Sequence, residues 1–169
     1  ERLARSLPVN AVIIGGYPWD DEYSRAVRER IAELQERVKV TVTGFIENSE
    51  VPAWLNRCRI LLVTSPSEGF GRMAAEALGC EAPVIANPTG GLLEIVDSGK
   101  SGYLPRYDDA EDFARLTSML LGDERLREQM GRQGRKDVLE RFSVDAMVAA
   151  YENVYEKVSL AYRQEKARR

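Results

Sequence analysis

Two glutamates, Glu68 and Glu76, lie eight residues apart in the segment "PSEGFGRMAAEALGC", which covers residues 66–80. The segment follows a short apolar run, contains two glycines, and then takes on the composition of a helix. A helix that begins at Gly71 or Arg72 presents unpaired N–H groups and the positive end of its dipole. Those two features together form a binding site for a phosphate group.

The two carboxylates flank this helix start and could bind hydroxyl groups. Glu68, just ahead of the helix, can accept hydrogen bonds from two adjacent hydroxyls, as on a hexose. Glu76, inside the helix, can accept from a second pair, such as a ribose diol. Gly69 and Gly71 allow a ligand to approach the main chain closely. This spacing fits a nucleotide sugar. The simpler alternative is that Glu76 is a solvated surface residue and that the glycines serve only the turn.

The composition excludes several other kinds of chemistry. The 169 residues contain no histidine, which removes the Ser-His-Asp and Cys-His arrangements and the HExxH zinc helix from this sequence. A net charge of −3 argues against a nucleic-acid partner, whose footprint would be basic. Gly15-Gly16 does not match the dinucleotide motif, and no P-loop is present. The pairs Asp20-Asp21 and Asp108-Asp109 stand at predicted helix starts, where capping explains them. We therefore expect no metal and no cofactor.

The sequence predicts one globular domain. Hydrophobic residues make up 44% of the chain, the mean hydropathy is −0.36, and no apolar run approaches the roughly 20 residues that cross a bilayer. Cys58 and Cys80 lie in or beside apolar segments without CxxC spacing, which is typical of reduced thiols in a cytosolic protein. We expect a cytoplasmic protein. Peripheral contact of its basic C-terminal tail with a membrane is an alternative.

Short apolar runs alternate with segments of helical periodicity. Strands are predicted at residues 10–16 (a buried run), 38–45, 59–65, 82–86 and 102–104, and helices at 20–37, 51–56, 72–79, 92–97, 109–121, 123–140 and from 143 onward. This alternation predicts an α/β fold with an open parallel sheet and helices on both faces. Ligands of such sheets bind beyond the carboxyl ends of the strands. The glycine-containing turns 15–16, 44–45, 66–71 and 87–91 all follow strands, so we expect them to share one edge.

The last predicted helix is amphipathic. Ser143 is a suitable N-cap, and an apolar stripe follows at Val144, Val148, Tyr151, Tyr155, Val158 and Tyr162. The stripe predicts that the helix packs against the body of its own chain. A coiled coil with a partner is the alternative.

The segment "PSEGFGRMAAEALGCEAPVIANPTGGLLEIVDSGKSGYL" (residues 66–104) resembles the donor-binding signature of retaining GT-B glycosyltransferases. The resemblance is to the glycogen-synthase-like and mannosyltransferase-like families, the glycosyl transferases group 1. Their E-x7-E motif matches Glu68 and Glu76. "AVIIGG", "VTVTGFIENSEVPAWLNRCRILLVTSPSEGFG" and "ERFSVDAMVAAYENVYEKV" extend the similarity almost from end to end. The resemblance implies that residues 1–169 form a Rossmann-like, nucleotide-sugar donor-binding domain, the C-terminal half of a GT-B fold.

The resemblance also implies what lies upstream of Glu1. The family's first strand of this domain, the arginine and lysine that bind the diphosphate, and the whole N-terminal acceptor domain are expected there. Residues at the start of this chain resemble the first helix. The family usually has glycine at the position of Glu81, so we expect the turn at this position to differ locally.

The resemblance assigns roles to individual residues. Glu68 is the candidate catalytic residue, because it would hold hydroxyls of the transferred sugar next to the reacting carbon, and Glu76 would bind the ribose diol. The other candidates for donor binding are Gly69, Phe70, Gly71, Arg72 and Met73 at the helix start, Phe45 and Ile46 near the nucleobase, and Gly90, Gly91 and Glu94. For Glu94, a helix-capping role is an equal alternative.

The resemblance thus implies a retaining glycosyltransferase. Its donor would be a nucleoside diphosphate sugar held without a metal, and its acceptor a glycan, a lipid or a small metabolite. The N-terminal GT-B domain would be its partner in the same chain, and residues 1–169 alone would transfer no sugar. Two alternatives stay open: a nucleotide-sugar epimerase of the same architecture, and a donor-binding module without catalysis.

Overall fold

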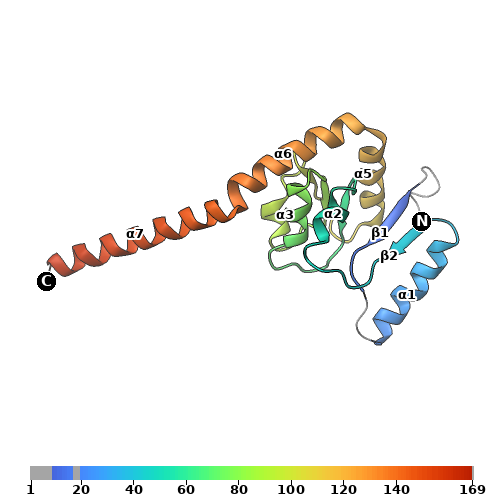
Figure 1. Cartoon of the computed structure of the whole chain (residues 1–169), viewed down its shortest axis with the longest axis horizontal. Coiled ribbons are helices and arrows are strands. Elements are labelled where there is room, and N and C mark those ends of the chain that lie inside the picture. Colours follow the sequence, from blue (N-terminus) through green and yellow to red (C-terminus); the bar gives the residue numbers. More distant parts are fainter. Residues whose placement is uncertain (1–8, 17–19, 169) are drawn as a thin grey trace.

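A computed structural model describes residues 9–16 and 20–168, and these residues form an α/β fold with a long C-terminal helix (Figure 1). The strands are β1 (Asn10–Ile13), β2 (Lys39–Val42), β3 (Leu61–Val63), β4 (Val84–Ala86) and β5 (Gly102–Tyr103). The helices are α1 (Glu22–Gln35), α2 (Val51–Leu55), α3 (Arg72–Gly79), α4 (Leu92–Ile95), α5 (Ala110–Gly122), α6 (Glu124–Phe142) and α7 (Val144–Arg168). Each of these elements was predicted from the sequence to within a few residues. The helix expected at the start of the chain falls on residues 1–8, outside the described residues.

The strands pair in parallel, as predicted, but their hydrogen bonds divide them into two groups. Strand β1 pairs with β2, and β4 lies between β3 and β5. The expectation that residues 10–16 form a buried strand is wrong, because three of the four residues of β1 are exposed. A strand is buried on both faces only where helices cover both, and here α1 packs on the neighbouring β2.

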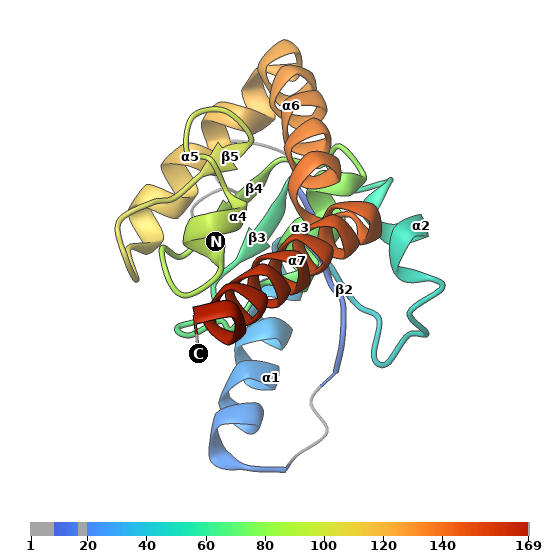
Figure 2. The same cartoon turned by 90° about the vertical axis from the view of Figure 1, so that its left-hand side faces the viewer.

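The core lies on the two faces of the three-stranded group. Val84 and Ala86 of β4 point into a cluster built with helices α2, α3 and α4. Ile85, which has the opposite orientation in the strand, points into a second cluster with α5 and α6. All three residues of β4 are completely buried. Helices therefore cover both faces, as the alternating sequence pattern predicted, and Figure 2 shows α5 and α3 on either side of these strands.

Helix caps agree with the sequence. The Asp21 carboxylate accepts a hydrogen bond from the Ser24 N–H at the start of α1, and this bond lowers the pKa of Asp21. Asp109 caps α5 in the same way by accepting from two N–H groups. Ser143 caps α7 through a 3.1 Å bond from the Ala146 N–H. The aspartates at these helix starts therefore act as caps.

Helix α7 does not pack on the body of the chain, and the expectation that it does is wrong. Figure 1 shows α7 continuing away from the body beyond the end of α6. The predicted apolar stripe is exposed along its whole length; Val144 is 70% exposed and Tyr162 66%. The chain is extended at Ser143, between α6 and α7, and α7 lies mainly against α6 among the other elements.

The turn after α3 keeps a conformation that favours glycine, although a glutamate occupies it. Glu81 has a φ of 61°, in the left-handed region that glycine adopts more readily than glutamate. The main chain of Glu81 lies against Gly131 of α6, where an added Cβ would be 2.1 Å from the Glu81 carbonyl oxygen. Close packing of α6 therefore holds the turn in this conformation.

Candidate functional site

The first turn of α3 has no side-chain cap among the described residues. Its N-cap is Gly71, with φ 93° and ψ 44°. The first helical bonds run from the N–H groups of Ala74 and Ala75 to the Gly71 carbonyl, so the preceding amides, of Arg72 and Met73, lack intrahelical acceptors. The φ of Gly71 favours glycine, and a Cβ there would lie 2.9 Å from Cδ2 of the Leu92 side chain, which would have to shift. Amides without intrahelical acceptors and the positive end of a helix dipole are the features that favour binding of an anion.

One face of α3 is buried and the other is exposed. Ala74, Ala75, Ala77 and Leu78 are buried in the core, whereas Arg72 and Glu76 are exposed. Arg72 and Glu76 are four residues apart, so they share the outer face of the helix. The sequence pattern of small residues around Glu76 thus reflects core packing of α3 against β4 and α6.

Among residues 9–16 and 20–168, no side chain occupies the carboxylate oxygens of Glu68 and Glu76. In the described part of the chain, the carboxylates of Glu68 and Glu76 form no ion pair and no side-chain hydrogen bond. The Arg72 guanidinium likewise forms no ion pair with a described residue. Glu68 is half-buried ahead of the helix start, and Glu76 lies in the second turn. Both carboxylates are therefore available as acceptors, and Arg72 supplies a positive charge.

Gly90 and Gly91 lie directly against the main chain of the Glu68 segment. A Cβ at Gly90 would be 1.7 Å from the Glu68 carbonyl oxygen, and one at Gly91 would be 2.2 Å from that of Phe70. The Gly91 N–H also donates to the Gly69 carbonyl at 3.1 Å. The main chain of Gly90 and Gly91 therefore packs directly against that of residues 68–70, a structural role that the sequence did not indicate. Its predicted contact with a donor stays a prediction.

Phe70 is held by the end of α6. Its ring meets that of Phe142 edge to face, with centroids 5.5 Å apart, and it remains 47% exposed. The Arg141 guanidinium lies 4.7 Å from the centre of the Phe142 ring and donates to the Glu94 carbonyl at 2.8 Å. Sequence reasoning missed Phe142 and Arg141, because they lie far from the motif along the chain.

The two residues after Gly44, Phe45 and Ile46, differ in burial. Phe45 is 84% exposed, and Ile46 is half-buried on the same core cluster as Ala74 and Ala75. Gly44, with φ 67°, bridges to Gly15 at the ends of β2 and β1. The structure therefore brings these two turns together, as expected for strands with a common carboxyl edge.

The described residues contain no group of three or more metal-ligating side chains, and no helix among them is long and apolar enough to cross a membrane. Cys58 and Cys80 are free and partly buried. Burial raises the pKa of both thiols, and in Cys58 a backbone hydrogen bond with Ile60 partly opposes this effect.

Comparison with known proteins decides the family. The model of the family "Glycosyl transferases group 1" matches residues 2–137. The chain belongs to this family. One relative, glycosyltransferase MJ1178 of Methanocaldococcus jannaschii, is 38% identical over 110 residues, which are 65% of this chain and 31% of the relative. The chain thus spans about a third of the length of this relative.

Solved structures of glycosyltransferases have the same fold. Sucrose-phosphate synthase from Thermosynechococcus elongatus superposes with a TM-score of 0.82 at 27% identity, covering 95% of this chain and 41% of that one. Anabaena HepE in complex with UDP and glucose superposes with a TM-score of 0.79 at 25% identity, covering 94% and 42%. The predicted fold class, the C-terminal half of a GT-B fold, is confirmed.

Proposed function

We propose that this chain binds the nucleoside diphosphate sugar donor of a retaining glycosyltransferase. The observation that carries the proposal is the uncapped start of α3, flanked by two carboxylates that have no partner in the described part of the chain. Family membership and the UDP and glucose present in the HepE complex support the choice of ligand.

In this proposal each part of the site binds one part of the donor. The amides of Arg72 and Met73, with the positive helix end, bind the diphosphate and stabilise the charge that develops as it leaves. Glu68 accepts hydrogen bonds from hydroxyls of the transferred sugar. Glu76, on the outer face of the second turn, accepts from the ribose diol, and Phe45 contacts the base. Catalysis then consists of positioning and charge stabilisation, without a protein-bound metal.

The acceptor belongs to the remainder of the longer protein in this proposal. The chain spans about a third of its curated relative and about two fifths of the similar solved chains. A second domain that faces the carboxyl edge of the strands would bind a glycan, a lipid or a small metabolite. Transfer would retain the anomeric configuration of the sugar, which nuclear magnetic resonance of the product checks directly.

Donor titration tests the nucleotide side of the site. The full-length protein is titrated by calorimetry with UDP-glucose, GDP-mannose and ADP-glucose, and we expect one nucleotide to bind selectively. Glu76→Gln removes the charge that accepts the diol and should weaken that binding roughly tenfold or more, since a hydrogen bond to a charged group contributes about 1.5–3 kcal/mol. Glu29→Gln, an exposed glutamate in the middle of α1, is the control and should bind like wild type. Equal affinities of all three proteins would remove Glu76 from the site.

Turnover tests the sugar side. Glu68→Gln should lower the rate of sugar release from the donor by more than tenfold, which is about 1.4 kcal/mol of barrier. The affinity for the nucleoside diphosphate alone should stay within twofold, because Glu68 contacts the sugar. Wild-type turnover in this variant would contradict the assignment.

A further inference from the structure

The main chain just before Glu68 is hydrogen-bonded by side chains from two other loops. The amide Nδ2 of Asn87 donates to the carbonyls of Thr64 at 2.9 Å and Ser65 at 3.3 Å. The Tyr107 hydroxyl donates to the Pro66 carbonyl at 3.1 Å, and the Thr89 hydroxyl reaches the same oxygen at 3.4 Å. Three successive carbonyls are therefore held from outside their own loop. We call Asn87, Thr89 and Tyr107 the inter-loop network.

Asn87 is the centre of this network. It directly follows β4, and its N–H donates to the Val63 carbonyl at 2.9 Å, which continues the pairing of β3 and β4. Its Oδ1 accepts from the Asp108 N–H at 3.3 Å. The side chain is 3% exposed and uses both its donor and its acceptor groups. One buried amide thus joins the loops that follow β3, β4 and β5.

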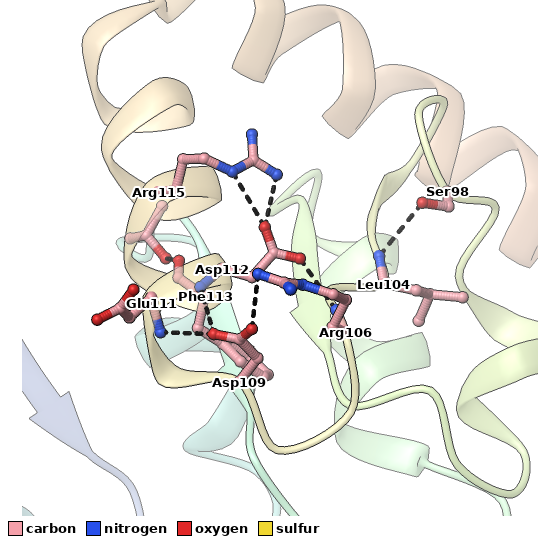
Figure 3. Close-up of polar contacts among 9 residues, drawn as sticks. Ser98, Leu104, Arg106, Asp109, Glu111, Asp112, Phe113 and Arg115 are labelled. Carbon is pink, nitrogen blue, oxygen red and sulfur yellow. Dashed lines mark hydrogen bonds and ion pairs between the residues drawn. The ribbon is translucent and has the colours of Figure 1, made fainter.

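The loop that follows β5 has stabilising contacts of its own. Figure 3 shows Asp112 at its base: one carboxylate oxygen accepts from the Arg106 N–H at 3.0 Å, and the other accepts two bonds from Arg115. The Arg106 guanidinium also pairs with Asp109 at 2.8 Å. These contacts fix residues 106–109, and hence the Tyr107 hydroxyl and the Asp108 N–H that reach the network.

We propose that Asn87 is a positioning residue that sets the place of Glu68 relative to the start of α3. The inter-loop network bonds the carbonyls of residues 64–66, while Gly90 and Gly91 lie against the main chain of residues 68–70 and the Gly91 N–H donates to the Gly69 carbonyl. Glu68 itself has no partner in the described part of the chain, so its carboxylate is placed only through its own main chain. The inference rests on the proposed function, in which Glu68 binds the sugar.

The test compares variants that change the network by one group. Asn87→Asp keeps the size of the side chain and its acceptor for the Asp108 N–H, but loses the donor to residues 64 and 65. Tyr107→Phe removes one hydroxyl at a half-exposed position. Thr117→Val is the matched control, because it removes a buried hydroxyl that bonds only within α5, to the Phe113 carbonyl at 2.7 Å.

Hydrogen exchange of the full-length protein gives the first readout. The Gly91 N–H, which donates to the Gly69 carbonyl, reports on the place of the Glu68 segment, and we expect this amide to exchange at least tenfold faster in Asn87→Asp and a few-fold faster in Tyr107→Phe, with no change in Thr117→Val. Exchange that is unchanged in Asn87→Asp, or that rises equally in the control, overturns the inference. This readout needs no ligand, so it decides the matter even if the protein binds no nucleotide sugar and the proposed function fails.

Kinetics gives the second readout. Among UDP-glucose, GDP-mannose and ADP-glucose, the donor that wild type accepts is used to measure sugar release. Asn87→Asp should lower kcat at least tenfold and leave the affinity for the free nucleoside diphosphate within twofold, because the nucleotide does not depend on Glu68. Equal losses in both quantities, or no loss in either, contradict a positioning role.

Discussion

Substitution of Gly90 by alanine should displace the main chain of Glu68. The new Cβ would lie 1.7 Å from the Glu68 carbonyl oxygen, whereas real Cβ contacts essentially never fall below 3.0 Å. One of the two backbone segments must therefore move by at least 1.3 Å, the difference between these distances. Because both atoms are fixed to the main chain, no change of rotamer can relieve the contact.

The cost has two parts, and a control separates them. Gly90 has φ 49°, and alanine in the left-handed region costs about 1–2 kcal/mol. Forced overpacking adds about 1–3 kcal/mol. Gly99 has φ 87° and nothing within 4 Å of the position that an added methyl group would take, so Gly99→Ala carries the conformational cost alone. We expect Gly90→Ala to be less stable than Gly99→Ala by about 1–3 kcal/mol.

Urea denaturation of the purified variants, followed by circular dichroism, measures this difference. Sugar release should fall by about a hundredfold in Gly90→Ala, since a displacement of about 1 Å in a positioned group has an effect of this size. Gly99→Ala should retain wild-type turnover. Equal stability and equal turnover of the two variants would refute the reasoning, because the close approach of Gly90 to Glu68 would then carry no cost.

Three further predictions concern the framework of the site. Glu81→Gly relieves a left-handed glutamate and should raise the free energy of unfolding by about 0.5–1 kcal/mol in urea denaturation, whereas lower stability would contradict strain at this turn. The pKa of Asp112 is lowered, chiefly by the bond from the Arg106 N–H and next by Arg115. The ionised carboxylate therefore stabilises the folded state above its ordinary pKa of 3.8, and this stabilisation is lost as the pH falls through the lower folded value. Asp112→Asn should therefore flatten the dependence of the free energy of unfolding on pH below about pH 4. The same pH dependence in the variant as in wild type would contradict stabilisation by the Asp112 carboxylate. Arg127 is buried and donates to two carbonyls at the end of α5, at 2.6 and 2.8 Å. Arg127→Met should lower the free energy of unfolding by about 2–4 kcal/mol, measured by thermal unfolding. A decrease below about 1 kcal/mol would show that water takes over the hydrogen bonds of the guanidinium.

Local signals in the sequence were enough to place the helices and strands. Helix α3 begins and ends at the predicted residues, because Gly71 precedes it and a run of small apolar residues fills its buried face. Asp21, Asp109 and Ser143 cap helices as predicted, since a cap depends on residues three positions apart or fewer. Burial was harder to predict. The apolar run of β1 indicated a buried strand, but burial depends on which elements cover it.

The candidate site likewise contains residues that the local sequence indicated and residues that it did not. The E-x7-E pattern identified Glu68, Glu76 and the helix start between them, and the structure leaves both carboxylates without a partner in its described residues. Tyr107 and Phe142 carried no recognisable signal, and Asn87 was indicated only as part of the turn at residues 87–91. Their importance comes from contacts across 22, 41 and 72 residues of sequence, and no local pattern encodes such contacts.

The sequence by itself determined the order of strands and helices, the caps, and the two carboxylates on either side of the start of α3. These features depend on neighbouring residues, whose types and spacing are visible in one dimension. Only the tertiary structure decided that Gly90 and Gly91 support the main chain of Glu68, that one buried asparagine joins three loops, and that the apolar stripe of α7 is exposed. Each of these depends on which distant segments meet, because hydrogen bonds and close packing act through space.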